Sequence, residues 1–83
     1  MKFLDCVEVM VEKECYAKYG VHKGMQGVIW LEECTDGKWD VYFPQYGEKS
    51  EIAEIPVKEE DLKLLPEGMD ARVNERIKAQ FEK

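Results

Sequence analysis

Three closely spaced glycines, Gly20, Gly24 and Gly27, constrain the fold of this chain more than any other feature. They punctuate a short apolar run that ends at Leu31. Glycine at such spacing marks backbone that adopts positive φ angles or approaches another strand closely. Since the run lies between two strand-like segments, it predicts the long first loop of a small β-barrel.

The length and composition indicate one folded domain. The chain has 83 residues, of which 45% are hydrophobic and 36% charged, as in globular rather than disordered proteins. No apolar run approaches the roughly 20 residues of a membrane span. The start of the chain lacks a signal-peptide pattern, and its three cysteines (Cys6, Cys15 and Cys34) are odd in number. We therefore expect free thiols in the cytoplasm and no membrane association.

The charge balance narrows the class of partner. The formal net charge is −6 at pH 7. Most non-specific affinity for nucleic acid comes from lysine and arginine at phosphates, so this balance disfavours nucleic-acid binding. An acidic surface suits a basic partner protein instead.

Strand-like patterns recur five times before Pro66. A single helical turn is expected from Glu59 to Leu62, just before the last of them. Short strands separated by turns indicate a small barrel. We expect a mainly β fold over residues 1–66, with strands at residues 6–11, 27–32, 39–43, 51–57 and 63–65.

Residues 67–83 predict a C-terminal helix. Asp70 is a suitable N-cap, and apolar residues follow at every fourth position (Met69, Val73, Ile77 and Phe81). This narrow stripe has two interpretations. The helix packs on the open end of the barrel, or it is an interaction arm for a partner or a homodimer through Val73, Ile77 and Phe81.

The turn Thr35-Asp36-Gly37 predicts the register of a hairpin. A three-residue loop with a left-handed Gly37 pairs Leu31 with Val41, Trp30 with Tyr42, and Ile29 with Phe43. A two-residue loop would mix apolar and polar positions on each face, so we expect the longer loop. The core face then carries Ile29, Leu31, Val41 and Phe43.

In this register Trp30 and Tyr42 stand opposite each other on the outer face. Such a cross-strand pair stabilises a sheet by roughly 0.5–1 kcal/mol. It could equally provide the surface on which the C-terminal helix packs. An exposed aromatic patch can also bind a partner. The first loop extends this patch if it folds over the same side, so the candidate partner-binding residues are Tyr16, Tyr19, Trp30 and Tyr42.

The segment Lys23-Gly24-Met25-Gln26-Gly27-Val28-Ile29 resembles the Lys-Gly-x-x-Gly-x-Val core of KOW-type loops, with Ile29 at the last position. The wider pattern from Asp5 to Leu65 is similar to bacterial SH3-like barrels, including a family of short barrel proteins, some of which act as immunity or regulatory partners. The resemblance implies a five-stranded SH3-like barrel in which Gly20, Gly24, Gly27 and Gly37 shape loops. It also implies a second possible function, RNA or ribosome binding, centred on Lys18 and Lys23.

Patterns that carry chemistry are weak in this chain. The three cysteines and His22, which we expect to be solvated, lack the close pairs of structural zinc sites. A cysteine–histidine nucleophile would need an orienting group and a deep pocket. The acidic cluster at Glu48, Glu51, Glu54 and residues 59–61 lacks the calcium-loop pattern. We expect no enzyme activity, metal or cofactor.

Three functions remain open. The first is a non-catalytic protein–protein interaction module, with an immunity-like or regulatory role toward a basic protein. The second is the KOW-like module that binds RNA or ribosomes. The third is a self-associating subunit that uses the C-terminal stripe.

Overall fold

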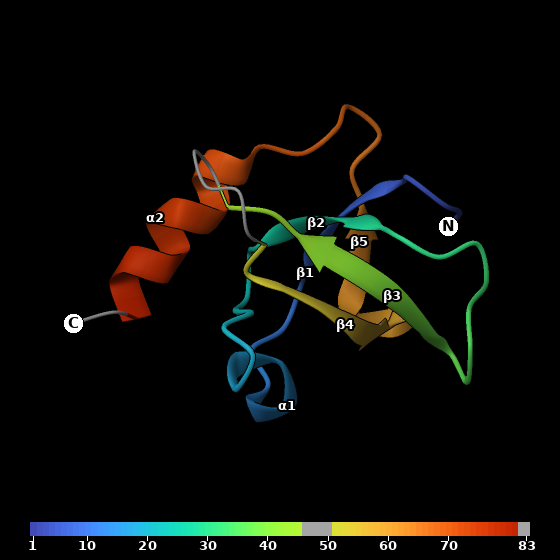
Figure 1. Ribbon diagram of the computed structural model, residues 1–83, viewed down its shortest axis with the longest axis horizontal. Coiled ribbons are helices and arrows are strands. Elements are labelled where there is room, and N and C mark those ends of the chain that lie inside the picture. Colours follow the sequence, from blue (N-terminus) through green and yellow to red (C-terminus); the bar gives the residue numbers. More distant parts are fainter. Residues whose placement is uncertain (46–50, 82–83) are drawn as a thin grey trace.

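The computed structural model describes residues 1–45 and 51–81 (Figure 1). Five strands form one antiparallel sheet in the order β4-β3-β2-β1-β5. Two α-helices and a 3-10 helix, η1, complete the chain. In sequence order the elements are β1 (Cys6–Val9), α1 (Glu14–Ala17), β2 (Gln26–Ile29), β3 (Lys38–Phe43), β4 (Ala53–Lys58), η1 (Glu59–Asp61), β5 (Leu62–Leu64) and α2 (Ala71–Phe81).

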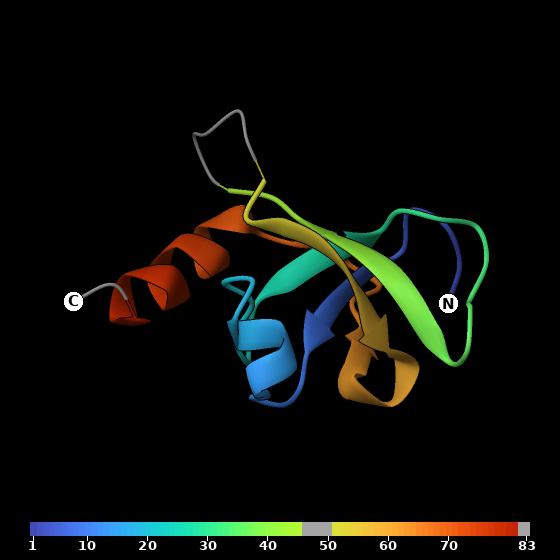
Figure 2. The same cartoon turned by 60° about the horizontal axis from the view of Figure 1, so that its bottom comes forward.

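The sheet curls into a half-barrel, with α1 and α2 beside it (Figure 2). The predicted mainly β fold with a C-terminal helix is therefore confirmed, and its architecture is compatible with an SH3-like barrel. The loop expected before the glycine run contains the single turn α1. None of the described helices is long and apolar enough to cross a membrane.

Alternation along the strands builds the core. In β1, β2 and β3 every second residue is buried, and the residues between them face the outer side of the sheet. Phe43 and Met25 are the largest fully buried side chains. The other core residues are mostly β-branched, as suits a tightly curved sheet, and include Val7, Val9, Val21, Ile29, Val41 and Val57.

The predicted pairing of β2 with β3 is wrong by two residues, because Ile29 was expected opposite Phe43. Ile29 lies opposite Val41 and Val28 opposite Tyr42. At the tip, Thr35 and Lys38 exchange two backbone hydrogen bonds of 2.9 Å, and Asp36 and Gly37 both have positive φ. The tip is thus a two-residue turn, so the expected three-residue loop is wrong, although Gly37 is left-handed as predicted. Additional residues between β2 and the turn account for the changed pairing.

The shifted register changes one core assignment. Ile29, Val41 and Phe43 are buried, as predicted, but Leu31 lies in the connecting segment and is exposed. Side chains of a strand alternate between the two faces of the sheet, so a shift by two residues leaves the other residues on the faces that were predicted for them.

The four glycines have different structural roles. Gly20, Gly24 and Gly37 have positive φ. Gly27 has an ordinary φ, but a Cβ atom there would lie 2.6 Å from the backbone oxygen of Tyr42. Both uses of glycine expected from the sequence occur: left-handed backbone and close approach of strands.

Helix α2 is attached to the sheet through Asn74, which is fully buried. Its Oδ1 atom accepts a hydrogen bond of 2.6 Å from the Gln26 N–H. Its Nδ2 group donates to the backbone oxygens of Gln26, at 2.7 Å, and Pro44, at 3.1 Å. On the same helix, the partly buried Ile77 packs against the core.

Candidate functional site

The outer face of the sheet brings two aromatic and two acidic side chains together. Trp30 donates a backbone hydrogen bond of 2.9 Å to Asp40, which continues the β2–β3 register, and Tyr42 lies opposite Glu54 on β4. The four residues therefore form a patch that spans three adjacent strand positions, with Asp40 and Tyr42 on β3 between Trp30 and Glu54, and we call it the outer array (Trp30, Tyr42, Asp40 and Glu54). The rings of Trp30 and Tyr42 are 5.2 Å apart and tilted by 30°. The expected aromatic pair is present, as diagonal rather than directly opposed neighbours.

The N-terminal segment extends this face. The Phe3 ring lies 6.0 Å from the Trp30 ring, and the N–H of Leu4 donates to the Ile29 oxygen at 2.8 Å. Large apolar side chains remain exposed here: Phe3 by 40%, Trp30 by 43%, and Leu4 and Leu31 by 54% each. On a domain of this size, exposed apolar residues that gather at one end of a sheet mark a contact surface.

Leu4 has a left-handed backbone, with a φ of 72°. It lies in a turn closed by a 3.1 Å hydrogen bond from the Asp5 N–H to the Lys2 oxygen. This conformation costs a non-glycine residue about 1–2 kcal/mol. Such strain persists where the surroundings impose it, often at binding sites. The turn holds Phe3 against Trp30 and leaves the Leu4 side chain exposed.

The strain predicts a reversed order of stability for alanine and glycine at Leu4. We expect Leu4→Gly to be more stable than Leu4→Ala by about 1 kcal/mol, because only glycine relieves the positive φ. At Leu31, equally exposed but without a positive φ, glycine should not gain over alanine. Urea unfolding of the four variants measures both differences. The same order at both positions would contradict strain at Leu4.

The carboxyl group of Glu54 is harder to ionise than usual because it lies beside that of Asp40. A hydrogen bond to Asp40, together with burial and the nearby charges of Asp40 and Glu51, raises the pKa of Glu54 to about 7. The Oδ2 atom of Asp40 is buried and has no hydrogen-bond partner among the described residues. The pair therefore gains negative charge as the pH rises through neutrality, and a cation placed beside it would stabilise that charge.

Carboxylates also border the array. Glu32 and Glu33 line a depression of about 440 Å³ with Trp30 and Leu31. The aromatic rings thus have acidic side chains on two sides, from β3–β4 and from the connecting segment.

Tyr16 does not belong to this surface, which corrects the prediction made for it. The side chain is buried, and its hydroxyl donates a 2.6 Å hydrogen bond to Asp61. Asp61 also accepts a 2.8 Å bond from Lys13. Burial opposes ionisation of Asp61, but these two bonds hold its pKa below the usual range. Burial and the bond to Asp61 raise the pKa of Tyr16 to about 12, so its hydroxyl stays protonated.

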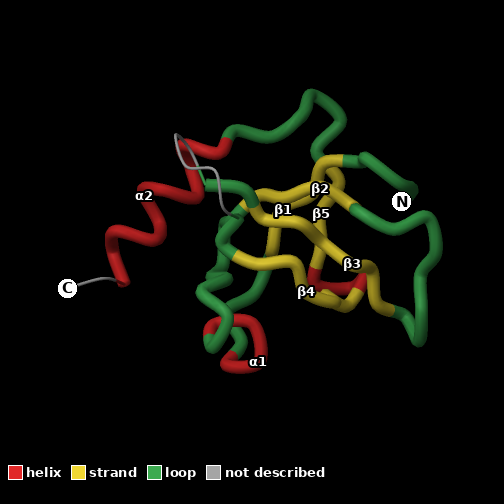
Figure 3. Tube along the Cα trace, viewed as in Figure 1, coloured by secondary structure: helices red, strands yellow, loops and turns green. Residues whose placement is uncertain are grey.

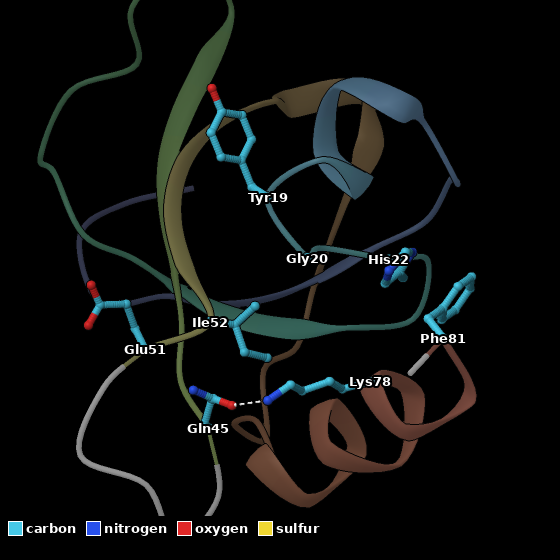
Figure 4. Close-up of a pocket in the computed structure, with 8 residues that line it drawn as sticks. All are labelled: Tyr19, Gly20, His22, Gln45, Glu51, Ile52, Lys78 and Phe81. Carbon is cyan, nitrogen blue, oxygen red and sulfur yellow. Dashed lines mark hydrogen bonds between the residues drawn. The ribbon is translucent and has the colours of Figure 1, made fainter. Parts of the chain in front are cut away.

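Tyr19 is exposed, as expected, but lines a separate cleft of about 320 Å³ between the first loop and α2 (Figure 4). In this cleft the His22 ring stacks on Phe81 with a centroid separation of 3.6 Å. The Nδ1 atom of His22 lies 2.8 Å from Glu12. His22 is therefore largely covered, which corrects its predicted solvation. None of the described lining residues is a cysteine, serine or threonine.

Other predicted groups are distributed around the fold. Cys15 and Cys34 are exposed and Cys6 partly buried, all three as free thiols. Within residues 1–45 and 51–81, no three cysteine, histidine or acidic residues gather as a metal site would require. In the apolar stripe, Val73 and Ile77 are half-buried, while Phe81 is 55% exposed beside His22. A homodimer contact through this stripe stays a prediction.

Some residues of the outer face escaped sequence reasoning. Asp40 and Glu54 could have been placed there from strand alternation, since Asp40 lies between the buried Trp39 and Val41. Phe3 and Leu4 precede β1 and had no periodicity to place them. Comparison of the chain with family models, curated proteins and solved structures finds no match.

Proposed function

We propose that the protein is a non-catalytic interaction module whose outer face binds a cationic, partly apolar segment of another protein. The observation that carries the proposal is the outer array, in which aromatic rings and carboxyl groups alternate. The face of an aromatic ring attracts lysine and arginine, and a neighbouring carboxylate adds a charged hydrogen bond.

The rest of the surface supports the same partner. Phe3, Leu4 and Leu31 offer apolar contact around the array. The net charge of −6 favours approach of a basic protein and raises its association rate. The role that fits this chemistry is an immunity-like or regulatory partner of a basic protein.

Peptide binding tests the proposal. The probe is a fluorescein-labelled peptide of alternating arginine and leucine, followed by fluorescence anisotropy. Truncating a central aromatic anchor typically costs about 2 kcal/mol or more. We therefore expect the Trp30→Ala/Tyr42→Ala double variant to bind about thirtyfold more weakly. Tyr19→Ala, which removes an exposed tyrosine from a different surface, should bind as the wild type does.

Two further comparisons sharpen this test. A peptide with neutral citrulline in place of arginine should bind poorly, because it lacks the positive charge. Affinity for the arginine peptide should rise from pH 6 to pH 8, since Glu54, with its pKa of about 7, loses its proton in that range. Equal binding of both peptides, or equal binding by a double variant that circular dichroism shows to be folded, would contradict the proposal.

A further inference from the structure

A second surface with the opposite charge lies along the free edge of β4. A groove of about 340 Å³ runs between α1 and this edge strand. Figure 3 shows α1 and β4 as neighbouring segments. The Tyr16 hydroxyl accepts a 3.2 Å hydrogen bond from the Lys58 N–H, which joins α1 to one end of the strand.

Three lysines line this groove: Lys18, Lys38 and Lys58. Lys38 and Lys58 are direct cross-strand partners, and both are exposed. Like charges placed directly opposite each other in a sheet are destabilising. Within the described residues, neither lysine forms an ion pair. In a chain with a net charge of −6, this is an unbalanced positive cluster.

The described lining of the groove holds three lysines and one carboxyl group. Glu54 lines it, but its pKa of about 7 leaves it only partly charged at neutral pH. Glu59 accepts a 2.9 Å hydrogen bond from the Trp39 indole. Asp61 is held by Lys13 and Tyr16. The described lining of the groove is therefore net positive toward an anionic ligand.

The backbone of the edge strand narrows the class of ligand. The backbone N–H of Glu59 donates a 2.9 Å hydrogen bond to the backbone oxygen of Gly37. This bond shows which residues of β4 are hydrogen-bonded to β3. In that pattern Ile55 and Val57 bond to β3, and the carbonyls of Glu54 and Pro56 face the groove. These carbonyls need N–H donors, which a peptide backbone carries and a nucleic-acid backbone lacks. Pro56 itself supplies no donor.

We propose that this groove binds an extended acidic segment of a partner protein, with carboxylates at Lys18, Lys38 and Lys58 and backbone N–H groups at the edge of β4. This mode adds a short strand to an exposed sheet edge. The site borders the outer array, with which it shares Glu54, but it takes a ligand of the opposite charge, so the module would bind two different segments.

Anisotropy with a fluorescein-labelled peptide of alternating glutamate and valine tests the groove. We expect the Lys38→Gln/Lys58→Gln variant to bind about tenfold more weakly, and Lys23→Gln, which removes an exposed lysine from the first loop, to bind unchanged. The double variant should be no less stable than the wild type, because it relieves a repulsion. The Trp30→Ala/Tyr42→Ala variant should retain the acidic peptide, which separates this site from the outer array.

Three results would overturn the proposal. The first is no binding of the acidic peptide at millimolar concentration, which would leave the lysines as guards against edge-to-edge aggregation. The second is equal binding by the lysine double variant. The third is tighter binding of a single-stranded oligonucleotide than of the peptide, with a steep salt dependence, which would assign the cluster to nucleic acid.

Discussion

Replacing Gly27 by alanine should destabilise the fold by about 3 kcal/mol or more. A Cβ atom at this position would lie 2.6 Å from the Tyr42 oxygen, 2.8 Å from Val41 Cγ1 and 3.0 Å from Phe43 Cδ1. The first contact is to backbone, so no side-chain rotation relieves it. Strands β2 and β3 would have to separate where the core is closely packed. Domains are stable by only about 5–15 kcal/mol, so the loss would be a large fraction of the total.

Gly37→Ala is the matched control for this prediction. Gly37 has a φ of 75°, but nothing lies within 4 Å of a Cβ placed there. Its substitution should cost about 1–2 kcal/mol from backbone conformation alone. Urea unfolding of both variants separates the steric cost at Gly27 from the conformational cost at Gly37. A smaller loss at Gly27 than at Gly37 would show that the two strands can move apart easily.

This contrast shows which parts of the fold were predictable from the sequence. Glycine spacing, alternating apolar residues and the Asp36-Gly37 turn are local signals, and they placed five strands and a helix. The half-barrel follows from them, because each strand has one apolar face to bury. The register at the hairpin was not predictable. Residues 31–34 shift the pairing between the turn and β2, and no local sequence pattern indicates this shift.

The outer surface was predictable only in part. Trp30 and Tyr42 were placed on one face by strand alternation, which survives a shift by a whole pair. Tyr16 was misplaced because its partner, Asp61, is 45 residues away in the sequence. A buried tyrosine with such a distant partner looks the same in sequence as an exposed one. Lys38 and Lys58 became neighbours only through the β3–β4 register.

The two proposed surfaces share a physical feature. In both, the fold places side chains where stability alone would not: exposed aromatic rings beside a strained Leu4, and two lysines opposite each other. Departures from local consistency are expected at functional sites, where binding offsets the cost. The core, in contrast, follows alternation closely, with Asn74 as its polar exception.

Asn74→Ala should destabilise the protein by about 2–4 kcal/mol, although alanine is the better helix former. Continuing the β2–β3 register places Gln26 opposite Pro44, where the next pair of ladder hydrogen bonds would form. Proline has no N–H to donate, so that rung cannot close. The Asn74 carboxamide takes its place: it accepts from the Gln26 N–H and donates to the oxygens of Gln26 and Pro44. Alanine would leave three backbone groups without these partners.

Two variants separate this bridging role from helix propensity. Gln80→Ala changes an exposed position of the same helix and should alter stability by no more than about 0.5 kcal/mol. Asn74→Asp keeps the acceptor but loses the donor, and it sets a carboxylate against two carbonyl oxygens. That variant should be severely destabilised at pH 7 and recover partly in acid, where a protonated carboxyl donates again. Hydrogen exchange at the Gln26 amide should accelerate in Asn74→Ala, which removes the acceptor of that amide. An unchanged Gln26 amide, or a loss in Asn74→Ala no larger than in Gln80→Ala, would show that α2 is not held to the sheet by this side chain.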